Sequence, residues 1–266
     1  MSEQGQWQVA GSAPEVYERD LVPAVFGPWA TILIGLAPPK VGDRVIDIAC
    51  GTGIVARIAA AKVGPSGAVA GVDLNPGMLN VARSLKTTDD AAPVQWQEAS
   101  ADKLPFPDGS FDVAYCQLGL QFFANRPAAL RNAQGSIYKG PARSDGVVQQ
   151  FEAFVEILER NVSPAAATMM RAPFGLSDAN ELSRLVAAAG FRDITIQQRV
   201  GAVEFPSVER FILSSVAGSP LASHVSQASD VARENLIADT KLALEKYVGN
   251  RGLSLPIAAH LLTAAV

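Results

Sequence analysis

The residues best placed for chemistry lie in the segment VIDIACGTGIVARIAA, residues 45–60. Gly51 and Gly53 directly follow an apolar, strand-like run, and a helical pattern begins within two residues. Glycines at this point let the backbone approach a ligand at the carboxyl end of a strand, beside a helix N-terminus. With Ala56 they also fit the G-x-G-x-x-A pattern of dinucleotide sites, so this segment does not choose between ligands. A tight turn without a ligand is the alternative.

Asp73 stands at the end of the next apolar run, twenty positions beyond Gly53. An acidic side chain there can accept hydrogen bonds from both hydroxyl groups of a ribose. The spacing suits NAD and S-adenosylmethionine (SAM) equally. A solvent-facing Asp at a strand end is the alternative, because turns favour Asp.

A third segment, EASADKLPFPDGSFDVAYCQLGLQFF at residues 98–123, separates these two cofactors. Its A-D-x-L-P-F-P-D-x-S-F-D run, residues 101–112, resembles the segment around the adenine pocket and fourth strand of class I SAM-dependent methyltransferases. The D-x-A-C-G-T-G run, residues 47–53, resembles their first motif. With Asp73, the resemblance covers residues 41–125 and is closest to the ubiquinone/menaquinone C-methyltransferase-like branch. It favours SAM over NAD.

This resemblance implies a SAM site at the carboxyl ends of the first four strands. Ala49 and Gly51 would line the methionine portion, and Asp73 would hold the ribose. Asp102 would bond the adenine amino group, and Tyr17 would close over the methionine carboxylate. The full set that the resemblance implies for the cofactor is Tyr17, Asp47, Ala49, Gly51, Gly53, Asp73, Leu74, Met78, Ala101, Asp102 and Cys116.

Candidates for acceptor contacts follow the expected fourth strand, in CQLGLQFF. Gln117, Gln121 and Phe122 are the first of these, although Phe122 and Phe123 can equally be core residues. His260, in the expected last strand, is a further candidate, although a lone His is more often structural. No residue declares itself as a catalytic base, and neither a Ser-His-Asp arrangement nor a metal-ligand cluster is recognisable in the sequence.

The elements that must position these residues follow from the hydrophobic pattern. Residues 41–125 alternate short apolar runs with helical ones, which predicts βαβ units and a doubly wound, Rossmann-like α/β sheet. We expect four parts: an N-terminal helical cap over 1–40, a SAM-binding core over 41–200, a C-terminal helical lid over 201–250, and a closing strand of the core sheet over 251–266. The core includes an atypical stretch at 131–150.

Composition excludes several classes of protein. The 266 residues are 48% hydrophobic and 18% charged, with a net charge of −4, which argues against a surface that neutralises nucleic-acid phosphates. Leu21 to Ala37 is apolar but is interrupted by Pro23, Gly27 and Pro28, so we expect a packed helical segment and no integral membrane span. Cys50 and Cys116 lie in apolar runs and are expected to be reduced, in a cytoplasmic protein. The sequence does not determine the oligomeric state, and a homodimer is possible.

Residues 131–150, RNAQGSIYKGPARSDGVVQQ, depart from the family pattern of an amphipathic helix, a Gly-Gly turn and a fifth apolar strand. We expect no strand here longer than about 146–149. Read one base later, codons for 132–136 can spell M-L-R-V-L, and codons for 142–149 can spell R-V-A-M-V-W-S. Both strings resemble the missing segment, which suggests a compensated reading-frame slip.

The function that the sequence favours is therefore SAM-dependent methyl transfer to a small, partly hydrophobic molecule. A carbon, oxygen or nitrogen acceptor is compatible with these residues. One alternative is a damaged or non-catalytic SAM-binding protein, because of residues 131–150. The second is an NAD(P)-dependent oxidoreductase, which the lack of a Tyr-x-x-x-Lys pair disfavours.

Overall fold

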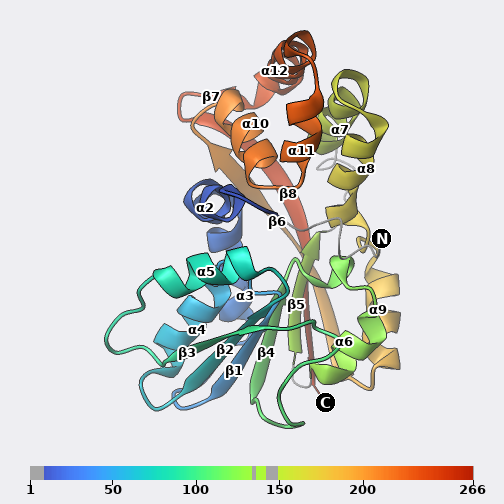
Figure 1. Ribbon diagram of the computed structural model, residues 1–266. Helices are drawn as coiled ribbons and strands as arrows, with labels where there is room; N and C mark the ends of the chain where they lie inside the picture. The colour runs from blue at the N-terminus through green and yellow to red at the C-terminus, as the bar shows by residue number, and fades with distance from the viewer. Residues whose placement is uncertain (1–8, 134–135, 142–148, 266) are drawn as a thin grey trace.

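A computed structural model describes residues 9–133, 136–141 and 149–265 (Figure 1). Within these residues, eight strands form one sheet of order β3-β2-β1-β4-β5-β8-β6, with β7 paired to β8. Strands β1 to β5 run parallel, whereas β8 is antiparallel to both β5 and β6. The strands are β1 Arg44–Ile48, β2 Ala68–Asp73, β3 Val94–Glu98, β4 Val113–Gln117, β5 Ser136–Pro141, β6 Arg192–Phe205, β7 Val248–Gly249 and β8 Gly252–Ala265. The predicted α/β fold is confirmed.

Helices cover both faces of this sheet, and further helices lie beyond its carboxyl-end edge (Figure 1). The α-helices are α2 Ala13–Val16, α3 Gly27–Leu36, α4 Ile54–Val63, α5 Pro76–Ser84, α6 Arg126–Asn132, α7 Gln149–Asn161, α8 Pro164–Arg171, α9 Ala179–Ala188, α10 Val208–Ala217, α11 Leu221–Gln227 and α12 Asp230–Leu244. Between α2 and α3 lies a π-helical run, η1 Tyr17–Phe26, and short 3₁₀ turns are η2 Leu120–Phe122, η3 Ala172–Phe174 and η4 Glu245–Tyr247.

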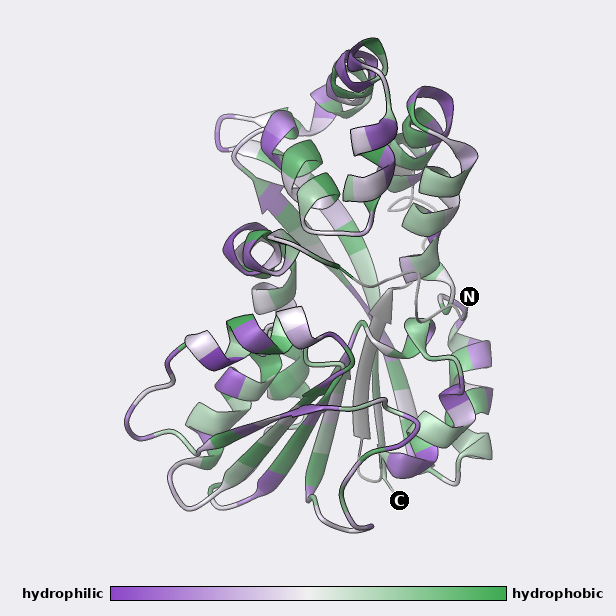
Figure 2. Ribbon diagram, viewed as in Figure 1, coloured by the Kyte–Doolittle hydropathy of each residue, from purple (hydrophilic) through white to green (hydrophobic). Residues whose placement is uncertain are grey.

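Alternation along the strands sends successive side chains to opposite faces of the sheet. Val45 and Tyr115 pack with α3 and α4 on one face, whereas Ile46 and Cys116 pack with α6 and α9 on the other. Figure 2 shows hydrophobic residues concentrated on these central strands. The core is therefore a sheet covered on both faces, which holds the strand ends in fixed positions.

Local sequence signals set the helices that border the strand ends. Asn75 caps α5: its side-chain oxygen accepts hydrogen bonds from the backbone N–H groups of Gly77, at 2.8 Å, and Met78, at 3.2 Å. Pro76 occupies the first helical position, where its missing N–H costs nothing. The turn that leaves β2 is thereby fixed next to Asp73.

The N-terminal helical segment, α2, η1 and α3, is here called the cap. It runs without a break from Ala13 to Leu36, and is long and apolar enough, by length and composition alone, to cross a membrane. In the fold, its last part instead packs against α4, where Ala30, Leu33 and Ile34 are buried. The segment thus serves here as a core helix that also reaches over the strand ends.

The lid, meaning α7, α8, α10, α11 and α12, is built from two stretches of chain on either side of β6. These helices share one apolar cluster, which includes Phe154 of α7 and Phe211 of α10. The ladder between β6 and β8 continues past the core sheet to the pair Phe205 and Leu253, and it carries the lid (Figure 1). The lid therefore draws on residues 149–171 as well as on the expected range of 201–250.

The fifth strand of the sheet is present, contrary to the expectation from residues 131–150. β5 pairs in parallel with β4 and antiparallel with β8, so the backbone groups of both neighbours are satisfied. The expectation of no strand longer than about 146–149 was wrong, because the strand precedes that stretch, at Ser136–Pro141. The reading-frame hypothesis falls largely on 134–135 and 142–148, which lie outside the described residues.

Gly53 supports a prediction about the stability of this core. Its φ of +86° is left-handed, and a Cβ placed there would lie 2.2 Å from the Trp96 ring. We expect Gly53→Ala to lower the free energy of unfolding by about 2–4 kcal/mol, through strain and overpacking together. Urea unfolding measures this loss.

The matched control is Gly109→Ala, because Gly109 also has a positive φ, +68°, but nothing within 4 Å of its Cβ position. Its loss should be smaller, about 1 kcal/mol. Equal losses in the two variants would mean that Trp96 does not pack on Gly53.

Candidate functional site

A cavity of about 230 Å³ lies where the carboxyl ends of β1, β2 and β4 meet. The strand order reverses between β1 and β4, and open α/β sheets bind their ligands at such a switch point. Residues that follow each of these strands line the cavity, and the cap closes one side through Tyr17 and Phe26. We call this space the first cavity.

Two residues without glycine's freedom adopt left-handed backbone at this edge. Ala49, after β1, has φ +58°, and Leu118, after β4, has φ +55°. Both line the first cavity, and a Cβ on Gly119 would lie 2.7 Å from the Cβ of Ala49. Strained backbone of this kind gathers at functional sites, and here it turns the chain sharply so that backbone faces the cavity.

The Asp73 carboxylate joins the turns that leave β1 and β2. One oxygen accepts the Gly51 N–H at 2.8 Å, and the other accepts the Asn75 N–H at 2.8 Å. Burial raises the pKa of Asp73, while these N–H groups offset part of that rise. Each oxygen keeps a further lone pair for a donor in the cavity.

Two buried polar atoms on the cavity wall lack hydrogen-bond partners in the described part of the chain. They are the Ser100 hydroxyl, after β3, and the side-chain oxygen of Gln117, at the end of β4. The Gln117 amide nitrogen donates to the Phe26 carbonyl at 3.0 Å, which leaves that oxygen as a free acceptor. Buried polar groups are nearly always paired, so a ligand is expected to bond here.

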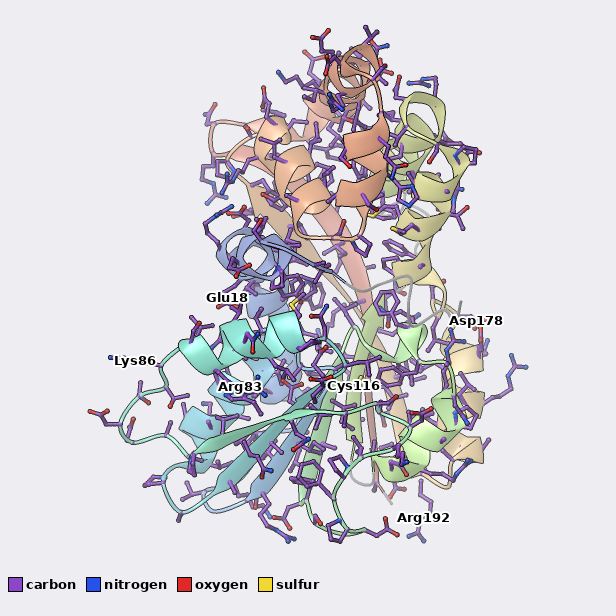
Figure 3. All side chains as sticks on the ribbon, viewed as in Figure 1. Glu18, Arg83, Lys86, Cys116, Asp178 and Arg192 are labelled. Atoms are coloured by element: carbon purple, nitrogen blue, oxygen red, sulfur yellow. The ribbon has the colours of Figure 1, made fainter. Side chains whose placement is uncertain are left out.

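The cap is tied to the core beside the cavity. Glu18 of η1, labelled in Figure 3, forms an ion pair with Arg57 of α4 at 2.8 Å, and Arg57 also donates to the Thr52 carbonyl. Tyr17 stacks on Phe26 with ring centroids 4.5 Å apart. A Cβ on Gly51 would lie 3.6 Å from the Tyr17 hydroxyl, so the missing side chain of Gly51 leaves room between turn and cap.

Most residues predicted for the cofactor and the acceptor line this one space. They are Tyr17, Ala49, Gly51, Asp73, Leu74, Met78 and Ala101 from the cofactor set, and Gln117, Gln121 and Phe122 from the acceptor set. Gln121 and Phe122 belong to η2, which follows β4. The structure thus brings together residues that lie 105 positions apart in the chain, from Tyr17 to Phe122.

Four residues of the predicted cofactor set do not line the first cavity. Asp47 faces α4 and accepts the Ala56 N–H at 3.0 Å, and Gly53 makes room for Trp96. Cys116 points into the core between the sheet and α6, where burial raises the pKa of its thiol to about 12 (Figure 3). Asp102 lies in the turn after β3. Asp47, Gly53 and Cys116 thus shape the site from behind, and the adenine contact expected of Asp102 stays a prediction.

His260 is also absent from the lining of either cavity described here. It is buried in β8, where its Nε2 lies 2.9 Å from the Ser177 carbonyl oxygen. β8 pairs with β5 and β6, and His260 lies opposite Gly140, one residue before the end of β5, and opposite Gln198 of β6. Its Nδ1 is buried without a hydrogen-bond partner among the described residues, and the acceptor contact expected of His260 stays a prediction.

Several lining residues were missed by the sequence reasoning. Asn75 had a readable signal, because Asn before Pro-Gly is a helix cap directly after Asp73. Ser100 adjoins the predicted Ala101 and could have been included with it. Phe26 and Pro173 had no local signal, since tertiary packing alone brings the cap and the stretch after α8 to the strand ends.

A second cavity, of about 260 Å³, adjoins the first. It lies between the cap, the lid and the extended ends of β6 and β8, and most of its lining is apolar. Tyr17, Phe26, Met78, Leu118 and Pro173 line both cavities. These shared residues form the passage between the two spaces.

Comparison with known proteins identifies the central part of the chain. A family model described as "Methyltransferase domain" matches residues 46–140. The ubiquinone/menaquinone biosynthesis C-methyltransferase UbiE of Ectopseudomonas mendocina is 43% identical over 105 residues, which is 39% of this chain and 41% of that protein. The 2-phytyl-1,4-naphtoquinone methyltransferase of Synechococcus elongatus is 33% identical over 148 residues, 52% of this chain and 63% of that protein. The matched region thus spans less than two thirds of each of these relatives.

Solved structures share the fold at low sequence identity. The YcgJ protein of Bacillus subtilis aligns with a TM-score of 0.56 at 21% identity, over 88% of this chain and 96% of its own. The phosphoethanolamine N-methyltransferase 2 of Haemonchus contortus, solved in complex with S-adenosyl-L-methionine, aligns with a TM-score of 0.53 at 20% identity, over 88% of this chain and 51% of its own. These likenesses establish the fold.

Asp47 gives a testable pH dependence of stability. Burial raises its pKa to about 8, partly offset by the Ala56 N–H and increased again by Asp73. The unfolded carboxyl titrates near pH 4, so between about pH 4 and 8 only the folded state keeps the proton, and stability falls as pH rises. Asp47→Asn removes this titration but keeps an oxygen for the Ala56 N–H.

We therefore expect Asp47→Asn to gain stability over the wild type as pH rises from about 4 to 8, by at most about 1.4 kcal/mol per pH unit. Below about pH 4 the difference should be constant. Urea unfolding across this range checks the result. A difference that stays flat from pH 5 to 8 would show that Asp47 titrates in the folded protein as it does in water.

Proposed function

We propose, from the premise that residues 46–140 form a methyltransferase domain, that this chain transfers the methyl group of SAM to a small, partly hydrophobic acceptor. One observation carries the proposal. The cavity at the strand ends, with Asp73 and unpartnered polar atoms on its wall, opens into a second, apolar cavity through shared residues. Such a pair of spaces suits a cofactor and an acceptor held side by side.

The residues present fit SAM along its length. Asp73, with Leu74 and Met78 beside it, would hold the ribose and adenine. The unpartnered Ser100 hydroxyl supplies a polar contact at this end of the cavity. At the other end, the left-handed backbone of Ala49 and the open position at Gly51 leave space for the methionine portion under the cap.

The chain would contribute binding and alignment to the reaction. SAM supplies an activated methyl group on a positively charged sulfur, so the protein need not activate the donor. Alignment of acceptor and methyl can contribute on the order of 7–11 kcal/mol in favourable cases. The turns after β1 and β4 fix the donor side, while the cap and lid border the passage between the cavities.

No Asp, Glu, His or Lys appears among the described residues that line the second cavity. Tyr17 is the titratable residue there, and burial raises its pKa well above the ordinary value, so its phenol stays protonated near neutral pH. We therefore propose that any acceptor proton leaves to solvent, before or after methyl transfer, without a side-chain base from this wall.

A cytoplasmic location is part of the proposal. Cys50 and Cys116 are both free and buried, as expected for a protein kept under reducing conditions. The relatives named as quinone methyltransferases act on apolar ring compounds, which supports a partly hydrophobic small molecule as the acceptor here.

Isothermal titration with S-adenosylhomocysteine, alongside NADH, tests the cofactor without knowledge of the acceptor. We expect S-adenosylhomocysteine to bind in the micromolar range and NADH not to bind. Asp73→Ala should weaken the binding of S-adenosylhomocysteine by about 1.5–3 kcal/mol, because charge-assisted hydrogen bonds to the ribose are lost.

The matched control for this variant is Asp102→Ala, a nearby acidic residue that does not line the cavity. It should leave the affinity within about twofold, since no direct contact is removed. Unchanged binding in Asp73→Ala would remove Asp73 from the site. Binding of NADH alone would contradict the methyltransferase proposal.

A further inference from the structure

The second cavity has a chemical character that restricts what it can bind. Its described lining includes five phenylalanine side chains, Phe26, Phe151, Phe174, Phe205 and Phe211, drawn from the cap, the lid and β6. Phe151 packs on Phe174 with ring centroids 4.3 Å apart, and Phe205 packs edge-on against Phe211 at 5.5 Å. Aromatic walls of this kind favour flat, apolar rings.

Charged side chains are absent from the described lining of this cavity. Asp20 and Arg210 lie nearby, on η1 and α10, but they bond each other, and Asp20 also accepts from the Ser214 hydroxyl at 3.2 Å. Their charges are therefore used to join the cap to the lid. An ionised ligand would lose its hydration here and gain no partner of opposite charge.

Ser215 is the one hydroxyl-bearing lid residue on this wall whose side chain forms no hydrogen bond to the described chain. It lies on α10 and is 9% exposed. Its neighbours differ: the Ser214 hydroxyl donates to Asp20, and the Ser219 hydroxyl donates to the Ser215 carbonyl at 2.6 Å. The Ser215 hydroxyl is therefore free to bond a polar group of a ligand in this mostly apolar cavity.

Ser215 lines the second cavity but not the first, whereas Tyr17, Phe26 and Leu118 line the passage between them. A molecule anchored at Ser215 therefore presents a different part of itself to the passage. The polar group that is recognised and the atom that is methylated must then be separate.

We infer that the second cavity takes an uncharged, largely apolar ring molecule whose hydroxyl or carbonyl group bonds Ser215, at a point remote from the atom that meets the methyl group. The inference rests on the proposed function, because it takes the first cavity as the donor site. It makes Ser215 a specificity-determining residue and excludes acceptors that carry a phosphate or carboxylate.

The test measures binding of 2-naphthol, naphthalene and 2-naphthyl phosphate, with and without S-adenosylhomocysteine. The wild type should bind 2-naphthol most tightly and 2-naphthyl phosphate at least about tenfold more weakly. Ser215→Ala should lower the affinity for 2-naphthol about fivefold to tenfold and leave the affinity for naphthalene unchanged, because only the hydroxyl contact is lost. Ser219→Ala, in the same cavity, should leave the ratio of the two affinities unchanged.

A second variant pair tests occupancy of the cavity by volume. Ser215→Trp should lower the affinities for 2-naphthol and for naphthalene alike, each by at least about tenfold, while the affinity for S-adenosylhomocysteine stays within about twofold. Leu213→Trp, on the same helix but 57% exposed, should change none of these affinities. Should Ser215→Trp fail to fold, Val25→Trp fills the same cavity from the cap.

Two results would overturn the inference: phosphate and hydroxyl probes that bind equally well, or equal losses for 2-naphthol and naphthalene in Ser215→Ala. S-adenosylhomocysteine binding separates this inference from the proposed function. If it binds while 2-naphthol shows no dependence on Ser215, this inference alone fails. If it does not bind while 2-naphthol still depends on Ser215, the proposed function fails and the ligand class of the cavity stands.

Discussion

The carboxylate of Asp73 holds the turn after β1 against the turn after β2, through the N–H groups of Gly51 and Asn75. Without this carboxylate, the two N–H groups would lack an acceptor. An unpaired buried N–H group lowers the stability of the fold by about 1–3 kcal/mol. Asp73 also lines the first cavity, so one side chain both organises the strand ends and can accept hydrogen bonds from a ligand. The left-handed turns at Ala49 and Leu118 lie at this same edge of the sheet.

The second cavity depends on elements that are remote from those turns. The long ladder between β6 and β8 leaves the core sheet and carries the lid, and the cap lies across its base. Asp20 of the cap bonds Arg210 and Ser214 of α10, while Glu18 bonds Arg57 of α4. The cap is thus attached on one side to the lid and on the other to the core, which keeps the two cavities adjacent.

Local patterns predicted the fold and the centre of the site well, because the glycine turn and Asp73 act within short segments of residues 41–125. Successive side chains of a strand point to opposite faces of the sheet, and this places Asp47 and Cys116 behind the cavity. Resemblance to a motif does not predict on which side such a residue lies. Tertiary packing brought Phe26 to the passage and joined residues 149–171 to the lid, so neither could be read from neighbouring residues. β5 was not predicted from the sequence, because pairing with β4 and β8, rather than its own short sequence, makes it a strand.

Hydrogen–deuterium exchange with and without S-adenosylhomocysteine tests most directly the claim that the cavity at the strand ends is the cofactor site. The account predicts slower amide exchange in residues 49–53, 73–78 and 117–119, with further protection in the cap around Tyr17, because ligand contacts and cap closure both reduce local opening. Protection confined to the lid, or none in these three turns at saturating ligand, would contradict it.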